Sequence, residues 1–92
     1  MQKVYKEGDK VFVLTHGTSN PDYGFERDEV RAFSSRDKAR KVLAEMLEHD
    51  KRDMTDDYKE ELALVIDKPD RYFVEGRRKD AFKAFIDEIT LE

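Results

Sequence analysis

Few side chains of this sequence have the type and spacing that chemistry requires. The only histidines are His16 and His49, and there is no cysteine, so no HExxH, HxH or thiolate-based ligand spacing is present. A catalytic triad would have to join Ser34 or Ser35 to His16, but a serine at the start of a helical pattern is better explained as an N-cap. The glycines form neither a dinucleotide-binding nor a phosphate-binding loop. We therefore predict no catalytic residue, no cofactor and no metal site.

Length and composition favour a binding domain over an enzyme. The chain has 92 residues, with 18 Lys and Arg against 22 Asp and Glu, a formal net charge of -4 and no cysteine. A chain of this size buries only about 60 to 65% of its unfolded surface and has few positions to spare for a catalytic cavity. No apolar run approaches the roughly 20 residues of a membrane span, and residues 1–10 do not resemble an export signal. We expect one cytoplasmic domain over 1–92 that is neither an enzyme nor a membrane protein.

Side-chain periodicity predicts an α+β fold, a small antiparallel sheet of about four strands with two helices packed on one face. The strands are expected near 10–16, 29–33, 71–75 and 83–91, and the helices over 35–50 and 56–66. Ser34 is the expected N-cap of the first helix, with Asp37 completing a capping box, and Thr55 is the expected N-cap of the second.

Three segments leave alternatives open. Leu62–Ile66 fits either the second helix, which we favour, or a strand that forms a hairpin with 71–75. Residues 81–92 have a helical stripe but a β-branched tail, and Val4 and Tyr5 could add a short strand. The stretch 17–28 is rich in turn formers and is predicted to be an unusually long hairpin tip.

Exposed aromatics and blocks of like charge are the candidates for contact with a partner. Tyr23 and Phe25 fall in the predicted tip, where they either pack back onto the sheet or anchor a partner. An acidic block follows the first helix, and a basic block precedes the last segment; such blocks are usually solvated faces. The basic helix start over 36–41 could hold a phosphate, although an ordinary solvated start is favoured. The candidate partner-binding residues are Tyr23, Phe25, Asp53, Asp56, Asp57, Glu60, Glu61, Arg77, Arg78 and Lys79.

Part of the chain resembles a group of small, uncharacterised bacterial and phage proteins. The resemblance lies in the strand Val11-Phe-Val-Leu-Thr-His16, the helix start Phe33-Ser-Ser-Arg-Asp-Lys-Ala39, and the closing Phe85-Ile-Asp-Glu-Ile-Thr-Leu91. It covers about half of the chain and departs from the pattern over 49–80. The resemblance implies a compact α+β domain, favours a strand over 83–91, and carries over no catalytic residue.

These observations together predict a non-enzymatic protein-binding module. The resemblance suggests an inhibitor or adaptor of phage or mobile-element origin that acts on a bacterial host protein such as a component of a defence system. The alternative is a small nucleic-acid-binding accessory protein that uses the basic segment 71–79, although the sequence pI of 5.2 argues against it. An open sheet edge could also pair two copies as a homodimer.

Overall fold

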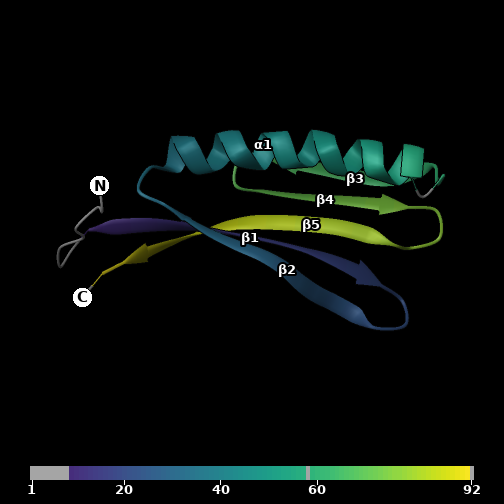
Figure 1. The fold of residues 1–92 in the computed structure, drawn as a ribbon, viewed down its shortest axis with the longest axis horizontal. Helices are drawn as coiled ribbons and strands as arrows, with labels where there is room; N and C mark the ends of the chain where they lie inside the picture. The colour runs from purple at the N-terminus through teal and green to yellow at the C-terminus, as the bar shows by residue number, and fades with distance from the viewer. Residues whose placement is uncertain (1–8, 58, 92) are drawn as a thin grey trace.

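The computed structural model describes residues 9–57 and 59–91, in which a single helical layer covers one face of a five-stranded antiparallel sheet (Figure 1). The strands are β1 (Lys10–Asn20), β2 (Gly24–Phe33), β3 (Leu62–Lys68), β4 (Arg71–Gly76) and β5 (Ala81–Thr90). Their order in the sheet is β2-β1-β5-β4-β3. The first and last strands of the described chain therefore pair at the centre, and the α+β class is confirmed with five strands instead of four.

The hairpin between β1 and β2 closes in a tight turn, so the prediction of a long tip over 17–28 was wrong. The side-chain oxygen of Asn20 accepts hydrogen bonds from the amides of Asp22 and Tyr23 at 2.9 and 2.8 Å. Gly24 then adopts a φ of +72°, which an L side chain rarely tolerates. These two residues reverse the chain within a few positions, and the polar residues on either side extend the two strands.

The helical layer is one element. Helix α1 (Arg36–Arg52) continues directly into a π-helical turn, η1 (Asp53–Asp57). Its N-cap is Ser35, and not Ser34 as predicted; the Ser35 hydroxyl accepts from the Lys38 amide at 3.4 Å. The predicted apolar stripe is confirmed, because Ala39, Leu43 and Leu47 are buried and Val42 and Met46 are partly buried against the same core.

The predicted second helix over 56–66 was wrong, and the alternative hairpin is confirmed. Thr55 does not cap a new helix: its hydroxyl donates back to the carbonyl oxygens of Lys51 and Arg52, inside the end of the first. Strand β3 pairs with β4, with Ile66 opposite Phe73. Residues 81–90 form β5, which confirms the strand predicted there. Val4 and Tyr5 lie outside the described residues.

The core lies between the helical layer and one face of the sheet. Its buried side chains are Phe12, Leu14, Ala39, Leu43, Leu47, Met54, Tyr72, Val74, Phe82, Ala84 and Ile86. Helix α1 packs chiefly against β1, β2, β4 and β5, so β3 lies at the margin of the covered area. In the described part of the chain, no element covers the opposite face of the sheet (Figure 1).

The continuous helix reverses the expected effect of two acidic residues. Asp56 and Asp57 lie at its C-terminal end, where the partial charge of the helix dipole is negative, instead of at a helix start. Asp56→Asn and Asp57→Asn should each raise the free energy of unfolding by about 0.3–1 kcal/mol at low ionic strength. Urea denaturation at low and high salt measures this gain, which should shrink as salt screens it.

Asp37, in the first turn of α1, provides the matched control. Asp37→Asn removes a carboxylate from the positive end of the dipole and should lower the stability by a similar amount. A loss of stability in the Asp56 and Asp57 variants would contradict the continuous helix.

Candidate functional site

The uncovered face of the sheet carries alternating cations and aromatic rings. In β4 the side chains of Arg71 and Phe73 lie two residues apart and share a face, as do those of Lys83 and Phe85 in β5. The antiparallel register sets Arg71 opposite Phe85 and Phe73 opposite Lys83. The four side chains therefore form a two-by-two checkerboard on the face that no helix covers.

A groove runs over this checkerboard toward the edge of the sheet. Its volume is about 530 Å³, and it is lined by Leu64, Ile66, Arg71, Tyr72, Phe73, Lys83 and Phe85. The lining is mostly apolar because β3 contributes Leu64 and Ile66, which are 46% and 36% exposed. We call this the open-face groove.

The cations of the open-face groove have no acidic partner among the described residues. Lys83 places its ammonium group 5.6 Å from the ring centroids of both Phe25 and Phe85. Neither Lys83 nor Arg71 forms an ion pair with a carboxylate in the described ranges. The groove thus combines an apolar floor with uncompensated positive charge in a chain whose net charge is -4.

The two predicted aromatic contacts lie in the turn of the β1–β2 hairpin and directly after it, where Phe25 is opposite Ser19. Tyr23 is 80% exposed in the turn. Phe25 is 44% exposed, yet its ring contacts the backbone of Gly17, where a Cβ atom would lie 2.6 Å from the ring. Phe25 therefore borders the same uncovered face as the groove, since the ammonium group of Lys83 lies against the rings of both Phe25 and Phe85. Tyr23 does not line the groove.

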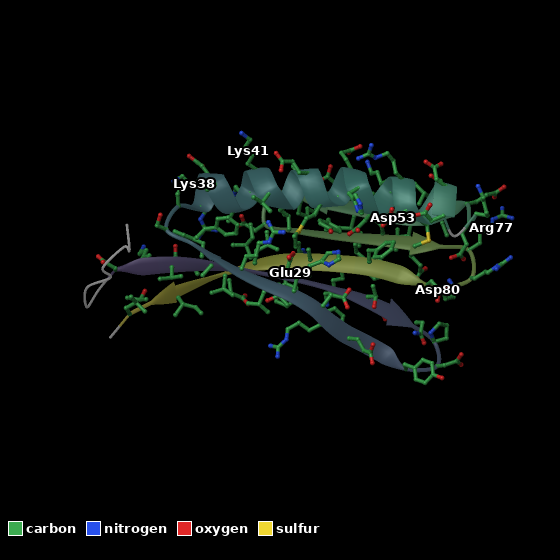
Figure 2. All side chains as sticks on the ribbon, viewed as in Figure 1. Glu29, Lys38, Lys41, Asp53, Arg77 and Asp80 are labelled. Atoms are coloured by element: carbon green, nitrogen blue, oxygen red, sulfur yellow. The ribbon has the colours of Figure 1, made fainter. Side chains whose placement is uncertain are left out.

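The acidic and basic blocks predicted from the sequence largely pair with one another or with neighbours. Glu61 binds Arg77 at 3.1 Å, at the end of the molecule where the helix terminates (Figure 2). Lys79 binds Glu75 at 3.4 Å. Glu60 is buried, and its Oε1 accepts from the amide of Arg78 at 2.7 Å, so its carboxylate has an internal role and is not part of the binding surface that we propose below.

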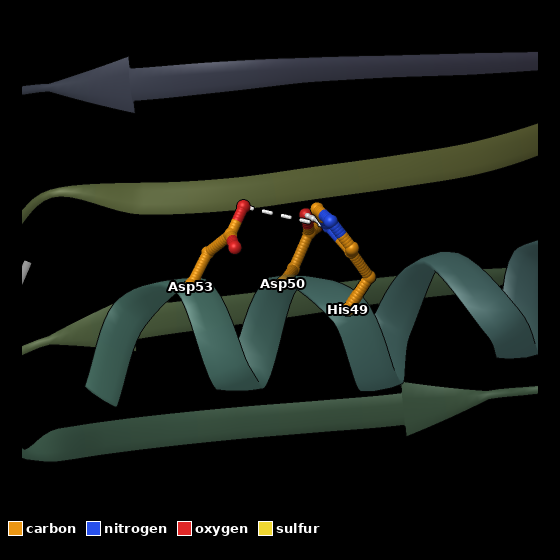
Figure 3. Close-up of side chains that lie close together, drawn as sticks. All are labelled: His49, Asp50 and Asp53. Atoms are coloured by element: carbon orange, nitrogen blue, oxygen red, sulfur yellow. Dashed lines mark ion pairs between the residues drawn. The ribbon is translucent and has the colours of Figure 1, made fainter. Parts of the chain in front are cut away.

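Asp53, Asp56 and Asp57 remain near the surface and line a shallow depression with His49 and Arg52. Asp53 lies 3.4 Å from Nδ1 of His49, and these two side chains project from the helix toward the sheet together with Asp50 (Figure 3). The ligand-type atoms of His49, Asp50 and Asp53 lie within 4.8 Å of one another. Asp50, however, already holds one carboxylate oxygen against Tyr72 and His16, which leaves a poor donor set for a cation.

Asp50 forms the main polar contact between the helix and the sheet. One of its oxygens, Oδ2, accepts from the hydroxyl of Tyr72 on β4 and lies 2.8 Å from Nε2 of His16 on β1. The hydrogen bond to Asp50 raises the pKa of His16, burial opposes the rise, and the charges of Asp50, Asp28 and Glu29 add to it. Burial, followed by the same carboxylate, strongly raises the pKa of Tyr72. His16 is thus a positioned, satisfied group and not a free base in a pocket.

The basic start of the helix is also used within the molecule. Arg36 and Arg40 both bind the carboxylate of Asp70, in the turn between β3 and β4, at 2.7 Å. The hydrogen bond from Arg40 is the main reason that the pKa of Asp70 is lowered. Arg36 also reaches Glu88 at 2.9 Å and stacks over the ring of Phe12. Only Lys38 and Lys41 of this basic run point to solvent (Figure 2).

Sequence reasoning identified neither the open-face groove nor Asp50. A signal for the groove was present, since the spacing Arg71-x-Phe73 recurs as Lys83-x-Phe85 in two strands. That signal becomes specific only when the register between β4 and β5 is known. Asp50 gave no signal, because an aspartate near a helix end usually faces solvent.

No family model, curated protein or solved structure matches this chain. Among the described residues, no helix has both the length and the apolar character needed to cross a bilayer.

The contact between His16 and Asp50 should make stability depend on pH. Because the folded-state pKa of His16 is above its ordinary value of 6.5, the folded protein holds this proton more tightly than the unfolded chain does. The stabilisation is complete below pH 6.5 and is lost as the pH rises through the folded-state pKa. Urea unfolding across this range should show a falling free energy of unfolding, which His16→Gln should flatten.

His49→Gln is the control for this measurement. It removes the other histidine, which is exposed on the helix, and should leave the pH dependence in place because His16 is retained. If His16→Gln kept the full slope, the His16–Asp50 contact would not be its source.

Proposed function

We propose that this protein is a non-enzymatic protein-binding module and that the open-face groove is its binding surface. The observation that carries the proposal is the combination in that groove of apolar side chains from three strands with two cations that form no ion pair within residues 9–57 and 59–91. A sheet normally buries an apolar face against another layer, and an uncovered apolar area marks an interaction site.

The chemistry of the groove indicates what kind of segment it accepts. Phe73, Phe85, Leu64 and Ile66 offer an apolar floor, which suits a partner that inserts apolar or aromatic side chains. Arg71 and Lys83 favour carboxylates beside those side chains, because opposite charges across an interface steer association and exclude other partners. We therefore expect the partner segment to be acidic and apolar. The resemblance to bacterial and phage proteins makes a bacterial host protein, such as a defence component, the first class of partner to examine.

Binding of single-stranded nucleic acid is the second candidate. Phe25, Phe73 and Phe85 with nearby Lys83 and Arg71 are the residue types on which bases stack and phosphates bind. Two features favour the protein partner. The aliphatic Leu64 and Ile66 provide no stacking surface, and two cations of the predicted basic segment, Arg77 and Lys79, are paired with glutamates.

Charge reversal in the groove tests the proposal. The double variant Arg71→Glu, Lys83→Glu should weaken the affinity for the protein partner by about tenfold or more, since it places like charges against the acidic segment. The partner is captured from a bacterial lysate on the immobilised protein, purified, and then titrated against each variant by calorimetry.

The double variant Lys38→Glu, Lys41→Glu is the matched control, with the same change of charge on the outer face of the helix (Figure 2), and it should bind as the unaltered protein does. If both variants bound equally well, the groove would be excluded as the binding surface. If the protein instead bound a single-stranded oligonucleotide with an affinity that fell steeply with salt, the nucleic-acid candidate would replace the first.

A further inference from the structure

Strand β3 forms one edge of the sheet, and it is apolar on both of its faces. No strand lies beyond it in the described part of the chain, so every second residue directs an N–H and a C=O group away from β4 without a strand to receive them. Leu64 and Ile66 face the open-face groove, whereas Val65, opposite Val74, faces the helical side. Leu62, Leu64, Val65 and Ile66 are all exposed.

The two edges of the sheet differ in how they are protected. Strand β2, the other edge, carries the charged residues Glu26, Arg27, Asp28, Glu29 and Arg31, and charges of this kind oppose pairing with another strand. In β3 the segment from Leu62 to Ile66 has no charged residue, no proline and no glycine. Its only irregularity is a bulge between Leu62 and Leu64, at the start of the strand. The edge from Leu64 onward is therefore left open to a further strand.

We propose that β3 pairs with β3 of a second copy of this chain, antiparallel, across a twofold axis perpendicular to the sheet. This proposal goes beyond the proposed function, because it needs neither the groove nor its partner. An axis in this direction keeps the two faces of the sheet distinct. Apolar side chains of one copy then lie beside apolar side chains of the other on both faces, which stabilises cross-strand pairs.

The bulge at the start of β3 and the charge of Asp67 near its end select the register. Because the axis preserves the faces, each residue lies opposite a residue of the same face, so one residue must lie on the axis. An axis at Val65 sets Val65 opposite itself and Leu64 opposite Ile66, twice. These pairs all lie beyond the bulge, in the regular part of the strand.

The neighbouring registers are less favourable. An axis at Leu64 would set Val65 and Ile66 of one copy against Ala63 and Leu62 of the other, where the bulge interrupts the regular pairing. An axis at Ile66 would set Val65 opposite Asp67 and leave its apolar surface beside a charge. The register centred on Val65 is the one that sets the apolar residues Leu64 to Ile66 against themselves without involving the bulge or a charged residue.

Pairing of this kind would produce a continuous ten-stranded sheet. Both helical layers would lie on one side of it and both open-face grooves on the other. Leu64 and Ile66 would still face their grooves, so the dimer would present two adjacent binding surfaces. A partner with two acidic and apolar segments would then gain affinity from simultaneous attachment.

The absence of cysteine from the chain permits a direct test of the register. Directly opposed residues of an antiparallel pair have Cα atoms about 4.5–5.5 Å apart, which a disulfide can span. Under mild oxidation, Val65→Cys should therefore form a covalent dimer, seen by non-reducing electrophoresis. Val30→Cys is the matched control, an exposed valine on the opposite edge strand, and should remain monomeric on the same gel. Equal cross-linking of the two variants would mean that the disulfides form by random collision in solution, and it would overturn the proposal.

Charge exchange at the same position provides a second, non-covalent test. The unaltered protein should have twice the 10.9 kDa mass of one chain in sedimentation equilibrium. Val65→Lys and Val65→Glu should each be monomeric, because like charges would meet on the axis, and an equimolar mixture of the two should recover the dimer. Val65 is exposed, so both variants should fold, which circular dichroism verifies. A monomeric unaltered protein, or a mixture that stays monomeric, would overturn the proposal.

The proposed dimer and the proposed binding surface can be tested separately, because different residues form them. Arg71→Glu with Lys83→Glu should weaken binding to the partner by about tenfold or more and leave the dimer intact. Val65→Lys should abolish the dimer and leave the affinity of each single groove unchanged. A dimer that survives Val65→Lys but dissociates in the groove variant would place the two copies face to face and exclude edge pairing.

Discussion

The buried carboxylate of Asp50 is the contact on which the arrangement of helix and sheet depends. It accepts from Tyr72 on β4 and contacts His16 on β1, two strands separated by β5. A buried carboxylate without these partners would be costly, so the helix can occupy only positions in which both contacts are made. Apolar packing of Leu43 and Leu47 supplies the attraction but constrains the position less. The Asp50 contact therefore fixes the helix across the sheet, and the ion pairs of Asp70 with Arg36 and Arg40 fix its other end.

The position of the helix leaves one face of the sheet uncovered. One helical layer is enough to bury the core face, and the described chain has no second layer for the other. On the uncovered face the side chains follow a regular pattern, in which Phe73 and Phe85 alternate with Arg71 and Lys83. Arg71 and Lys83 form no ion pair with a carboxylate among the described residues, so their charges on this face can select an acidic partner.

The two edges of the sheet also differ, since one is charged and the other is apolar. Strand β2 has charges along its length, which favour water over another strand, whereas the apolar β3 extends beyond the area that the helix covers. The groove and the open edge both involve β3. The side chains of Leu64 and Ile66 line the groove, and the backbone of the same strand forms the edge of the sheet. The region from β3 to β5 is accordingly the part of the molecule best suited to contact other chains.

The amino-acid sequence by itself determined the α+β class, the apolar stripe of the first helix and the strand near 10–16, since each depends on local periodicity. It did not determine that Leu62–Ile66 is a strand, because a short apolar run fits either structure until β4 is present to pair with it. It did not reveal that Asp56 and Asp57 end a helix instead of starting one, that Glu60 is buried, or that Asp50 contacts His16. Only the tertiary structure decided these points and brought Arg71-x-Phe73 beside Lys83-x-Phe85, because each depends on residues far apart in the chain whose contacts are set by strand register and packing.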